Sequence, residues 1–327
     1  MSFSYGNNIK LTLGGGSHER AVSVSIEGIP VGTEVDMLAV QKLLDQRAPG
    51  KGKLSTSRVE TDVPSILNGL TPSSNSDKDI FSVTGPIQAE FLNKDIQTGT
   101  YESYIPRPGH GDYPAWVKAG AKGPLPDGGA TSARLTVGIV FAGAIAMQIL
   151  AKKGISITAK AEIGQAQNRA SAEDSFGGKV SCAISGLPVG MGESYFDGLE
   201  SRLSSAVFAI PAVKAIEFGV GIKACDMLGS EYNDAFYFDE NRKVKTMTNN
   251  SGGILGGMTN GMPVEFTATF KPTPSIALEQ DSVDLFTGEN VKLKIHGRHD
   301  RCIVPRAVPI VEAMSALVIL DLMMEAL

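Results

Sequence analysis

The chain has 327 residues, of which 42% are hydrophobic and 20% are charged, and it contains 37 glycines and 17 prolines. This composition excludes a mainly disordered protein and is typical of one large folded unit, or two smaller ones, with many tight turns. The chain has 30 basic and 35 acidic residues, so its net charge is −5. This charge argues against attraction of nucleic acid or anionic membrane to the whole surface, but leaves room for a local basic pocket.

The cysteines and the N-terminus bear on the compartment. Cys182, Cys225 and Cys302 form no C-x-x-C pair and no zinc spacing, which favours a reducing compartment, no disulfide framework and no metal site. The N-terminal sequence MSFSYGNNIK lacks the apolar core of a signal peptide. The longest apolar stretch, residues 137–150, is shorter than the roughly 20 residues that span a bilayer. We therefore expect a cytoplasmic protein.

Two similar segments mark corresponding places in the two halves of the chain. Residues 26–32 read Ile-Glu-Gly-Ile-Pro-Val-Gly, and residues 184–190 read Ile-Ser-Gly-Leu-Pro-Val-Gly. We interpret them as traces of an internal duplication, with related halves at about 1–160 and 161–327 packed about a pseudo-twofold axis in a single domain. The alternative is a chance recurrence of Gly-x-Pro turns.

Hydrophobic patterns predict the main helices and strands. A helix-like stretch follows each repeat and a long apolar helix closes each half, which gives helices at 37–46, 133–153, 195–205 and 308–327. Gly154 follows the second of these as a C-cap. Strands are expected at 155–161, 179–184, 264–270 and 291–295, while residues 138–140 fit a strand or a helix start. Polar residues predict loops at 71–79 and 165–174 and a surface excursion at 239–251.

The two closing helices are apolar almost all round, so neither has a broad solvated face. A helix of this kind must be covered on several sides, and flanking sheets would supply that cover. We therefore expect an α+β fold with a central layer of helices between sheets.

Three of the four histidines lie beside glycine and another polar residue: His18 in Gly-Gly-Ser-His, His110 in Arg-Pro-Gly-His-Gly-Asp, and His299 in Gly-Arg-His-Asp. Glycine lets a backbone approach a ligand closely, and histidine can move a proton near neutral pH. Each histidine alone is more simply explained as a loop residue that caps a turn. Three such contexts in so histidine-poor a chain favour a functional site.

Several cations also lie near glycine or proline. A pocket that gathered them would bind a ligand with several negative charges. For the two lysines, a solvated basic loop is an equally good interpretation. The set comprises Arg47, Lys51, Lys53, Arg58, Arg107, Arg134 and Arg298.

Two further segments have a backbone suited to a phosphate or a cofactor. Residues 249–257 contain a double Gly-Gly loop, and residues 271–276 combine a lysine, two hydroxyls and two prolines. The sequence contains no Walker loop, no Gly-x-Gly-x-x-Gly motif that opens a helix after a strand, and no Gly-x-Ser-x-Gly elbow. An ordinary dinucleotide-binding fold is therefore not indicated.

Taken in order along nearly the whole chain, these motifs resemble those of chorismate synthases, the last enzymes of the shikimate pathway. Each motif is weak alone, but the ordered set is highly specific. The motifs are Gly15-x-Ser17-His18, Ile26-Glu27-Gly28-x-Pro30-x-Gly32, Arg47-x-Pro49-Gly50, Thr56-x-Arg58-x-Glu60-x-Asp62, Arg107-Pro108-Gly109-His110-x-Asp112-Tyr113, Gly128-Gly129-x-x-Ser132-Ala133-Arg134-x-Thr136, Asp174-Ser175-x-Gly177-Gly178, Ala212-Val213-Lys214, Gly229-Ser230-Glu231, the 252–257 loop, Lys271-Pro272-Thr273 and Gly297-Arg298-His299-Asp300.

The resemblance implies an activity, a cofactor and an assembly. The reaction would be the 1,4-anti elimination of phosphate from 5-enolpyruvylshikimate 3-phosphate, which gives chorismate for aromatic amino acid biosynthesis. It would use reduced FMN without net redox change, and some members of the family reduce the FMN with NADPH. The resemblance also implies antiparallel sheets around the helical layer and a homotetramer. We expect no nucleic acid and no membrane partner.

The resemblance also assigns roles to residues of this sequence. His18 would be the acid at the departing phosphate, His110 would lie beside the flavin N1–C2 edge, and Asp300 would accept a proton near the flavin N5. Substrate anions would be bound by Ser17, Arg47, Lys53, Arg58, Arg107 and Arg134, with Lys53 where an arginine is usual. The flavin would contact Ala130, Thr131, Ser132, Pro211, Ala212, Gly257, Lys271, Pro272, Thr273, Pro274, Ser275 and Arg298.

The sequence departs from the family pattern next to several of these residues. Gly16 and Glu19 stand where glutamate and glycine are usual, and Arg301 replaces a proline after Asp300. A longer insertion is usual between the strand near Ile163 and Asp174, and here it is cut to a short loop. The other departures are Gln46, Ala130, Leu135 and Pro211.

Two other interpretations stay open at this point. These departures are compatible with a divergent relative that binds flavin or an anionic metabolite without catalysis. A flavin oxidoreductase with net hydride transfer is the third possibility. Substrate-dependent oxidation of the flavin would separate it from an elimination.

Overall fold

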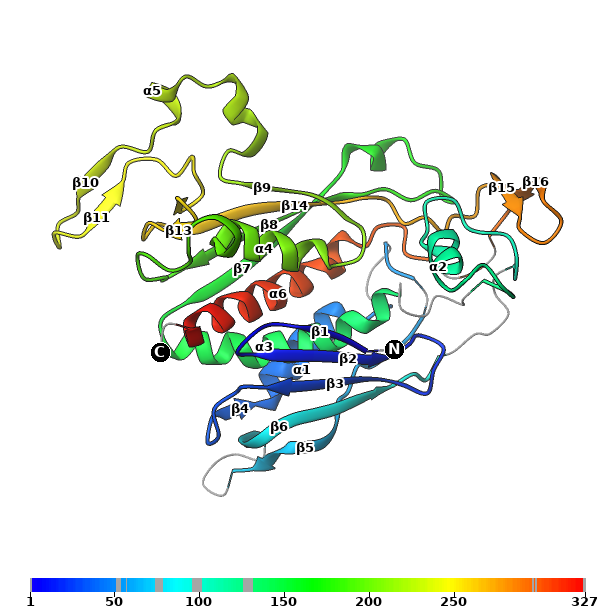
Figure 1. Cartoon of the computed structure of the whole chain (residues 1–327), viewed down its shortest axis with the longest axis horizontal. Coiled ribbons are helices and arrows are strands. Elements are labelled where there is room, and N and C mark those ends of the chain that lie inside the picture. Colours follow the sequence, from blue (N-terminus) through cyan, green and yellow to red (C-terminus); the bar gives the residue numbers. More distant parts are fainter. Residues whose placement is uncertain are drawn as a thin grey trace.

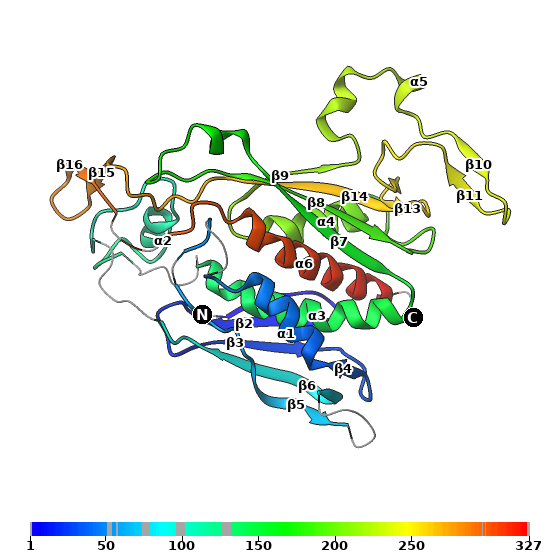
Figure 2. The ribbon, with the colours of Figure 1, turned by 180° about the vertical axis from the view of Figure 1, so that it is seen from behind.

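The computed structural model describes residues 2–50, 54–56, 58–73, 79–95, 102–125, 132–295, 297 and 299–325. Its long helices lie between two antiparallel sheets, one above and one below them in Figure 1, and the view from behind in Figure 2 shows the same three layers. The expected α+β sandwich with a central helical layer is therefore confirmed.

The first half of the chain forms a six-stranded sheet in the order β1-β2-β3-β6-β4, with β5 also paired to β6. Along β3, the side chains of Val22, Val24 and Ile26 are buried and alternate with more exposed neighbours. Because burial alternates with a period of two, one face of the sheet packs against the helices. The strands are β1 (Ser2–Tyr5), β2 (Lys10–Gly15), β3 (Ala21–Glu27), β4 (Glu34–Asp36), β5 (Ser65–Pro72) and β6 (Ile80–Leu92).

The second half forms a four-stranded sheet in the order β7-β8-β14-β9. Its strands are β7 (Ser156–Ile163), β8 (Gly178–Ser185), β9 (Val213–Phe218) and β14 (Val264–Phe270). The strand expected at 264–270 has those bounds, and those expected at 155–161 and 179–184 lie within two residues of β7 and β8. All pairs in this sheet are antiparallel, as expected.

The middle layer contains the helices α1 (Met37–Arg47), α3 (Thr136–Lys152) and α6 (Val304–Glu325), and α4 (Leu199–Phe208) also packs against α6. Helix α1 begins where the carboxylate of Asp36 accepts hydrogen bonds from the backbone N–H groups of Leu38 and Ala39. Helices α3 and α6 pack against each other so closely that a Cβ on Gly143 would collide with the backbone of Ala313. Only glycine permits this approach.

The two closing helices correct one expectation from the sequence. The helical segments Ala133–Lys152 and Val304–Glu325 are long and apolar enough to cross a membrane, although the first stretch was expected to be too short. However, 72% and 78% of their most apolar windows are buried inside the fold, so we interpret both as core helices. Residues 138–140 belong to α3 and not to a strand. Gly154 ends α3 with a φ of +78°, as expected for a C-cap glycine.

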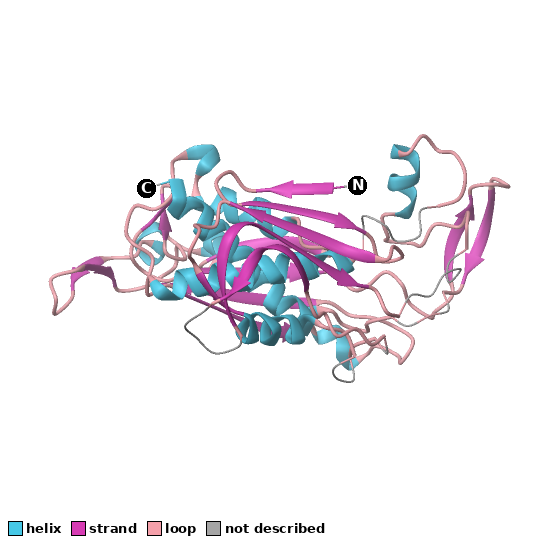
Figure 3. Cartoon of the chain, turned by 90° about the horizontal axis from the view of Figure 1, so that it is seen from below, coloured by secondary structure: helices cyan, strands magenta, loops and turns pink. Residues whose placement is uncertain are grey.

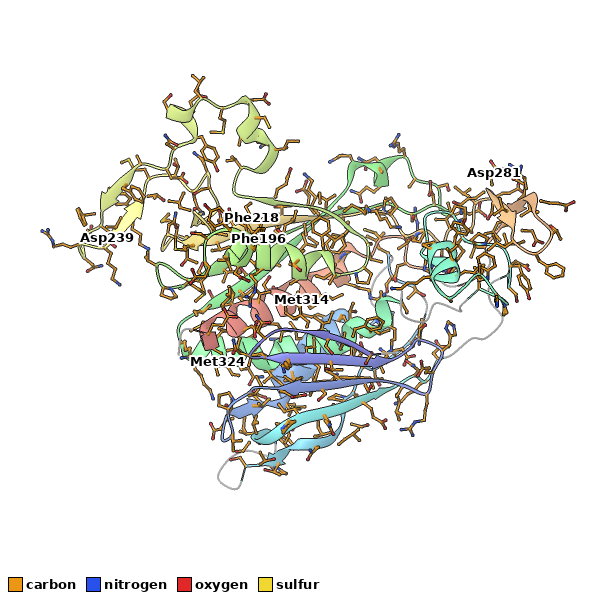
Figure 4. All side chains as sticks on the ribbon, in the orientation of Figure 1. Phe196, Phe218, Asp239, Asp281, Met314 and Met324 are labelled. Atoms are coloured by element: carbon orange, nitrogen blue, oxygen red, sulfur yellow. The ribbon has the colours of Figure 1, made fainter. Side chains whose placement is uncertain are left out.

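Smaller elements surround these layers. The helix expected at 195–205 is a 3₁₀ turn, η4 (Tyr195–Asp197), followed by α4 (Leu199–Phe208), and the strand expected at 291–295 begins and ends two residues earlier. Hairpins β10–β11 and β15–β16 project at opposite ends, where Figure 4 labels Asp239 and Asp281 and Figure 3 shows them from below. The remaining elements are α2 (Asp112–Lys118), α5 (Gly229–Tyr232), β10 (Phe236–Phe238), β11 (Val244–Thr246), β12 (Ile254–Leu255), β13 (Met258–Thr259), β15 (Gln280–Asp284), β16 (Glu289–Leu293) and three further 3₁₀ turns, η2 (Ala133–Leu135), η3 (Gln165–Asn168) and η5 (Gly221–Asp226).

The corresponding glycines of the two sequence repeats have matching φ angles. Gly28 and Gly32 have φ values of +91° and +85°, and Gly186 and Gly190 have values of +87° and +84°. Such values favour glycine because they lie in the left-handed region. Each repeat follows an inner strand of its sheet, β3 or β8. The duplication of halves at 1–160 and 161–327 stays a prediction, which these matching turns support.

Candidate active site

Arg47 and Arg134 share one buried carboxylate, that of Asp62. Nε and Nη2 of Arg47 donate to Oδ2 of Asp62 at 2.9 and 2.6 Å, and Nη1 of Arg134 donates to Oδ1. Arg47 is the last residue of α1 and Arg134 lies in η2 just before α3, so two helix ends carry the pair. Burial lowers the pKa of Arg47 to about 10, against the attraction of Asp62. Because the cluster holds two cations and one anion, it is suited to bind an anionic ligand.

Asn93 joins this cluster to the turn that carries His18. Its Oδ1 accepts a hydrogen bond from Nε of Arg134 at 2.8 Å, and its Nδ2 donates to the carbonyls of Gly16 and Glu19 at 3.0 and 2.7 Å. His18 lies between these two carbonyls in the β2–β3 turn, with its Nδ1 3.1 Å from Oγ of Ser17. One amide therefore sets the place of the His18 turn relative to Arg134.

Gly16 and Glu19, which stand where glutamate and glycine are usual in the family, lie close together in the structure. A Cβ built on Gly16 would lie 3.2 Å from Oε1 of Glu19. The carboxylate of Glu19 thus folds back over the place where a side chain at position 16 would begin.

Arg58 is paired beside the same strand end. Its Nη2 lies 2.7 Å from Oε1 of Glu60, whose carboxylate is buried. The two oxygens of Glu60 also accept hydrogen bonds from the backbone N–H groups of Lys94 and Asp95, both at 3.3 Å. The two residues that follow Asn93 therefore bind the carboxylate that pairs with Arg58.

The carboxylate of Asp300 connects the two halves of the chain. Its Oδ1 accepts hydrogen bonds from the backbone N–H of Thr56 at 2.9 Å and from Oγ of Ser55 at 3.3 Å. Its Oδ2 lies 2.7 Å from Nη1 of Arg306, in the first turn of α6. Nε of Arg306 donates to the carbonyl of Arg47 at 2.9 Å, which links Asp300 to the first cluster.

A second cluster surrounds Asp112, the first residue of α2. Nε and Nη2 of Arg107 donate to its two carboxylate oxygens, each at 2.8 Å, and Nδ1 of His110 lies 2.7 Å from Oδ1. Burial by itself would raise the pKa of Asp112, but the hydrogen bonds from Arg107 and His110 outweigh it and hold this pKa well below its usual range. Nη1 of Arg107 also donates to Oγ of Ser275 at 3.3 Å.

The segment after β14 packs against this second cluster. Nζ of Lys271 donates to the carbonyl of Gly109 at 2.9 Å, and its backbone N–H donates to the carbonyl of Ala212 at 2.9 Å. Burial and the nearby Lys214 lower the pKa of Lys271. Two ammonium groups held near one another are typical of a place where a phosphate binds. Ala212 has a φ of +73°, a strained value for a residue with a side chain.

These contacts form one path from the His18 turn to His110. The two clusters are joined through Thr273, whose Oγ1 donates to the carbonyl of Asp300 at 2.7 Å and which lies two residues before Ser275 in the chain. A cavity of about 40 Å³ behind the path touches Arg47, Pro211 and Asp300, and it is far smaller than a typical ligand pocket of about 300–1,000 Å³. The path runs through Asn93, Arg134, Asp62, Arg47, Arg306, Asp300, Thr273, Ser275 and Arg107.

Most of the predicted site residues therefore gather at one end of the layers, the right-hand end of Figure 1. Oγ of Ser132 accepts the backbone N–H of Arg134, and Pro274 lies against Gly109. Gly257 is not part of this group, because it lies in the β12–β13 turn before β14, while Lys271 follows β14. The strand between them, β14, has seven residues and is about 20 Å long. Four predicted residues lie outside the described part of the chain: Lys53, Ala130, Thr131 and Arg298.

The sequence interpretation missed two residues of this network and the role of a third. Asp62 was noted only as part of a motif, and Asn93 and Arg306 were not noted at all. Arg306 carried a usable signal, since it is the one cation of a mostly apolar helix and lies in its first turn. Asn93 carried only the weaker signal of a polar residue directly after a long strand.

Comparison with known families gives one consistent result. The family model described as chorismate synthase matches residues 9–171 and 159–324. A chorismate synthase of Dehalococcoides mccartyi is 38% identical over 364 aligned positions, which cover 100% of this chain and 98% of the relative. Those of Thermococcus kodakarensis and Korarchaeum cryptofilum are each 39% identical and cover 97% and 99% of this chain and 96% and 98% of their own lengths.

A solved crystal structure described as chorismate synthase has the same fold. It superposes with a TM-score of 0.71 over 99% of this chain and 94% of that chain, at 21% sequence identity. The alignment with the Dehalococcoides relative has about 37 more positions than this chain has residues. The two ranges matched by the family model overlap at residues 159–171, beside the place where the shortened loop was expected.

Proposed function

The chain belongs to the chorismate synthase family, and we propose that the network between His18 and His110 carries out the reaction of that family. This reaction is the 1,4-anti elimination of phosphate from 5-enolpyruvylshikimate 3-phosphate, which yields chorismate, with reduced FMN as the cofactor. The observation that carries the assignment of residues is the continuous path of contacts that brings both histidines and four arginines to one end of the fold.

The substrate carries a phosphate and two carboxylates, so its site must offer several cations. We assign this binding to Ser17, Arg47, Arg58, Arg107 and Arg134, together with Lys53. Each of these arginines has five N–H donors, which is more than its carboxylate partner accepts. Helices α3 and α6 also begin in this region. The partial positive charge at a helix N-terminus favours an anion there.

We assign the proton that goes to the departing phosphate to His18. A protonated or cation-clamped phosphate leaves more easily, since less charge develops on it in the transition state. Arg134, held by Asn93 beside the same turn, would share in this stabilisation.

The residues around Lys271 fit a flavin mononucleotide. Lys214 and Lys271 supply cations for its phosphate, and Ser275 supplies a hydroxyl beside Arg107. When bound, the reduced flavin supplies electron density to the breaking C–O bond without net redox change. His110, oriented by Asp112, would hold a proton at the flavin edge, and the carboxylate of Asp300 would accept one near N5. Ser132, Pro211, Ala212, Pro272, Thr273 and Pro274 would contact the flavin, together with Ala130, Thr131 and Arg298.

Gly257 lies at the far end of β14, so a flavin bound beside Lys271 could reach a Gly257 only from another copy of the chain. This relation supports a homotetramer, as do the exposed hydrophobic side chains of the 222–247 region. These side chains are Ile222, Leu228, Phe236, Phe238 and Met247. NADPH is the proposed source of electrons for the flavin. A small-molecule biosynthetic enzyme of this kind would be cytoplasmic, with no nucleic acid or membrane partner.

An anaerobic assay tests the function. The chain is mixed with chemically reduced FMN and 5-enolpyruvylshikimate 3-phosphate, and chorismate and phosphate are followed together. We expect equal release of both without net oxidation of flavin, and loss of both in His18→Ala while FMN still binds. Arg20→Ala is the matched control, because Arg20 lies in the same turn but pairs at the surface with Glu90. Substrate binding without any product would instead identify a non-catalytic relative.

A further inference from the structure

Arg301, one of the departures from the family pattern, anchors the short connection between β7 and β8. Its Nη2 donates to the carbonyl of Ser171 at 2.6 Å, and its Nε donates to the carbonyl of Asp174 at 3.3 Å. Its guanidinium also lies over the ring of Phe176, 5.5 Å from the centroid. One side chain therefore holds three residues of the connection.

The backbone of Arg301 adds a second set of anchors. Its carbonyl accepts the N–H of Phe176 at 3.0 Å, and its own N–H donates to the carbonyl of Leu54 at 3.0 Å. The residue before it, Asp300, holds Thr56 through its carboxylate. Residues 300–301 thus bind one segment from each half of the chain.

The connection held by Arg301 also reaches the segment proposed to bind the cofactor. Oγ of Ser175 donates to the carbonyl of Thr273 at 2.7 Å, and Oγ1 of Thr273 donates to the carbonyl of Asp300 at 2.7 Å. A closed loop of contacts therefore runs from Arg301 through Ser175 and Thr273 back to Asp300. Displacement of the connection would move Thr273 and Asp300 together.

We propose that Arg301 is a positioning residue, which clamps the shortened β7–β8 connection onto the site and thereby fixes Asp300 and Thr273. This inference rests on the proposed function only for the identity of the cofactor. The two ranges matched by the family model overlap at 159–171, in the end of β7 and the first part of the same connection. Arg301 and the short connection, both departures from the family pattern, are therefore in direct contact in this chain.

The test compares Arg301→Ala and Arg301→Lys with Arg169→Ala, which removes an exposed arginine from the same connection. Three quantities are measured on the full chain: affinity for FMN, affinity for 5-enolpyruvylshikimate 3-phosphate, and amide hydrogen exchange. For Arg301→Ala we expect FMN affinity to fall by about tenfold, as for the loss of about one charge-assisted hydrogen bond, and substrate affinity to stay within about twofold. Exchange should quicken at 54–56, 171–177 and 271–275. Arg301→Lys should recover part of the loss, and Arg169→Ala should change nothing.

Unchanged exchange at those three segments in a folded Arg301→Ala variant would overturn the inference, and so would equal loss of FMN and substrate affinity. A general loss of stability would lower the unfolding temperature and quicken exchange throughout the sheets as well. Should Arg301→Ala fail to fold, Arg301→Lys gives the same comparison with the charge retained. Wild-type protein that binds FMN but releases no chorismate would contradict the proposed function alone.

Discussion

Nη1 of Arg306 lies 2.7 Å from Oδ2 of Asp300, and both side chains are mostly buried. Because Nε of the same guanidinium donates to the carbonyl of Arg47, the ion pair also ties Asp300 to the end of α1. An arginine can make both contacts at once because its donors are spread over a rigid fork. The place of Asp300 therefore depends on Arg306, a residue to which we assign no ligand contact.

We expect Arg306→Gln to lower kcat by about tenfold while the KM for the substrate changes by less than about threefold. The variant removes the cation that orients Asp300 but leaves Arg47 and Arg134 on Asp62. Steady-state kinetics under anaerobic conditions measure the split. Arg169→Gln, at an exposed position of the β7–β8 connection, is the control. Wild-type kcat in Arg306→Gln would remove Arg306 from this role.

Asp62→Asn is expected to destabilise the fold by about 3–5 kcal/mol, because it leaves two buried guanidinium groups without their shared anion. The carboxylate of Asp62 is fully buried and contacts Arg47 and Arg134. Urea unfolding measures the free energy change. Asp197→Asn is the matched control, since the side chain of Asp197 is 69% exposed and lies 3.5 Å from Arg202. Equal stability of the two variants would contradict the shared ion pair.

Asn93→Asp should lower kcat by about tenfold or more, with substrate affinity nearly kept. The new carboxylate can still accept from Arg134, but it would face the carbonyls of Gly16 and Glu19 with oxygen in place of N–H. Repulsion would then shift the His18 turn. Kinetics and substrate titration on the same preparation separate the two effects, with Asn68→Asp in the exposed part of β5 as control. A large loss of substrate affinity with unchanged kcat would show that Asn93 serves the anion site instead.

The depressed pKa of Asp112 predicts a stability change in acid. Its native pKa lies below its ordinary value of 3.8, so the unfolded chain binds a proton more readily than the folded one. The stability that Asp112 contributes is therefore present in full above about pH 5 and is lost progressively as the pH falls toward the native pKa. Unfolding of wild type and Asp112→Asn should differ most at neutral pH and converge in acid. A constant difference from pH 7 to pH 3 would exclude this linkage.

Local sequence was sufficient for much of the fold. The alternation in residues 264–270 predicts β14, and the apolar closing helices predict an inner layer. The similar turns at 26–32 and 184–190 have matching glycine conformations. These features depend on neighbours within a few residues, where period and turn chemistry act directly.

The motifs also located many of the candidate site residues, because the order of His18, Arg47, Arg107, Arg134 and Asp300 along the chain is specific to the family. They could not show how these residues are connected. Asn93 meets Arg134 across 41 positions, and Arg306 meets Arg47 across 259. Such contacts are decided by which strand ends and helix ends pack together.

The sequence by itself thus determined the element types, the inner helices and the chemical character of the site. Only the tertiary structure decided that Asp62 serves two arginines, that Asn93 holds the His18 turn, and that Arg301 clamps the short loop. The physical reason is that buried charges and amides need partners, and folding supplies those partners from distant segments. A linear pattern names the groups, and packing decides which of them meet.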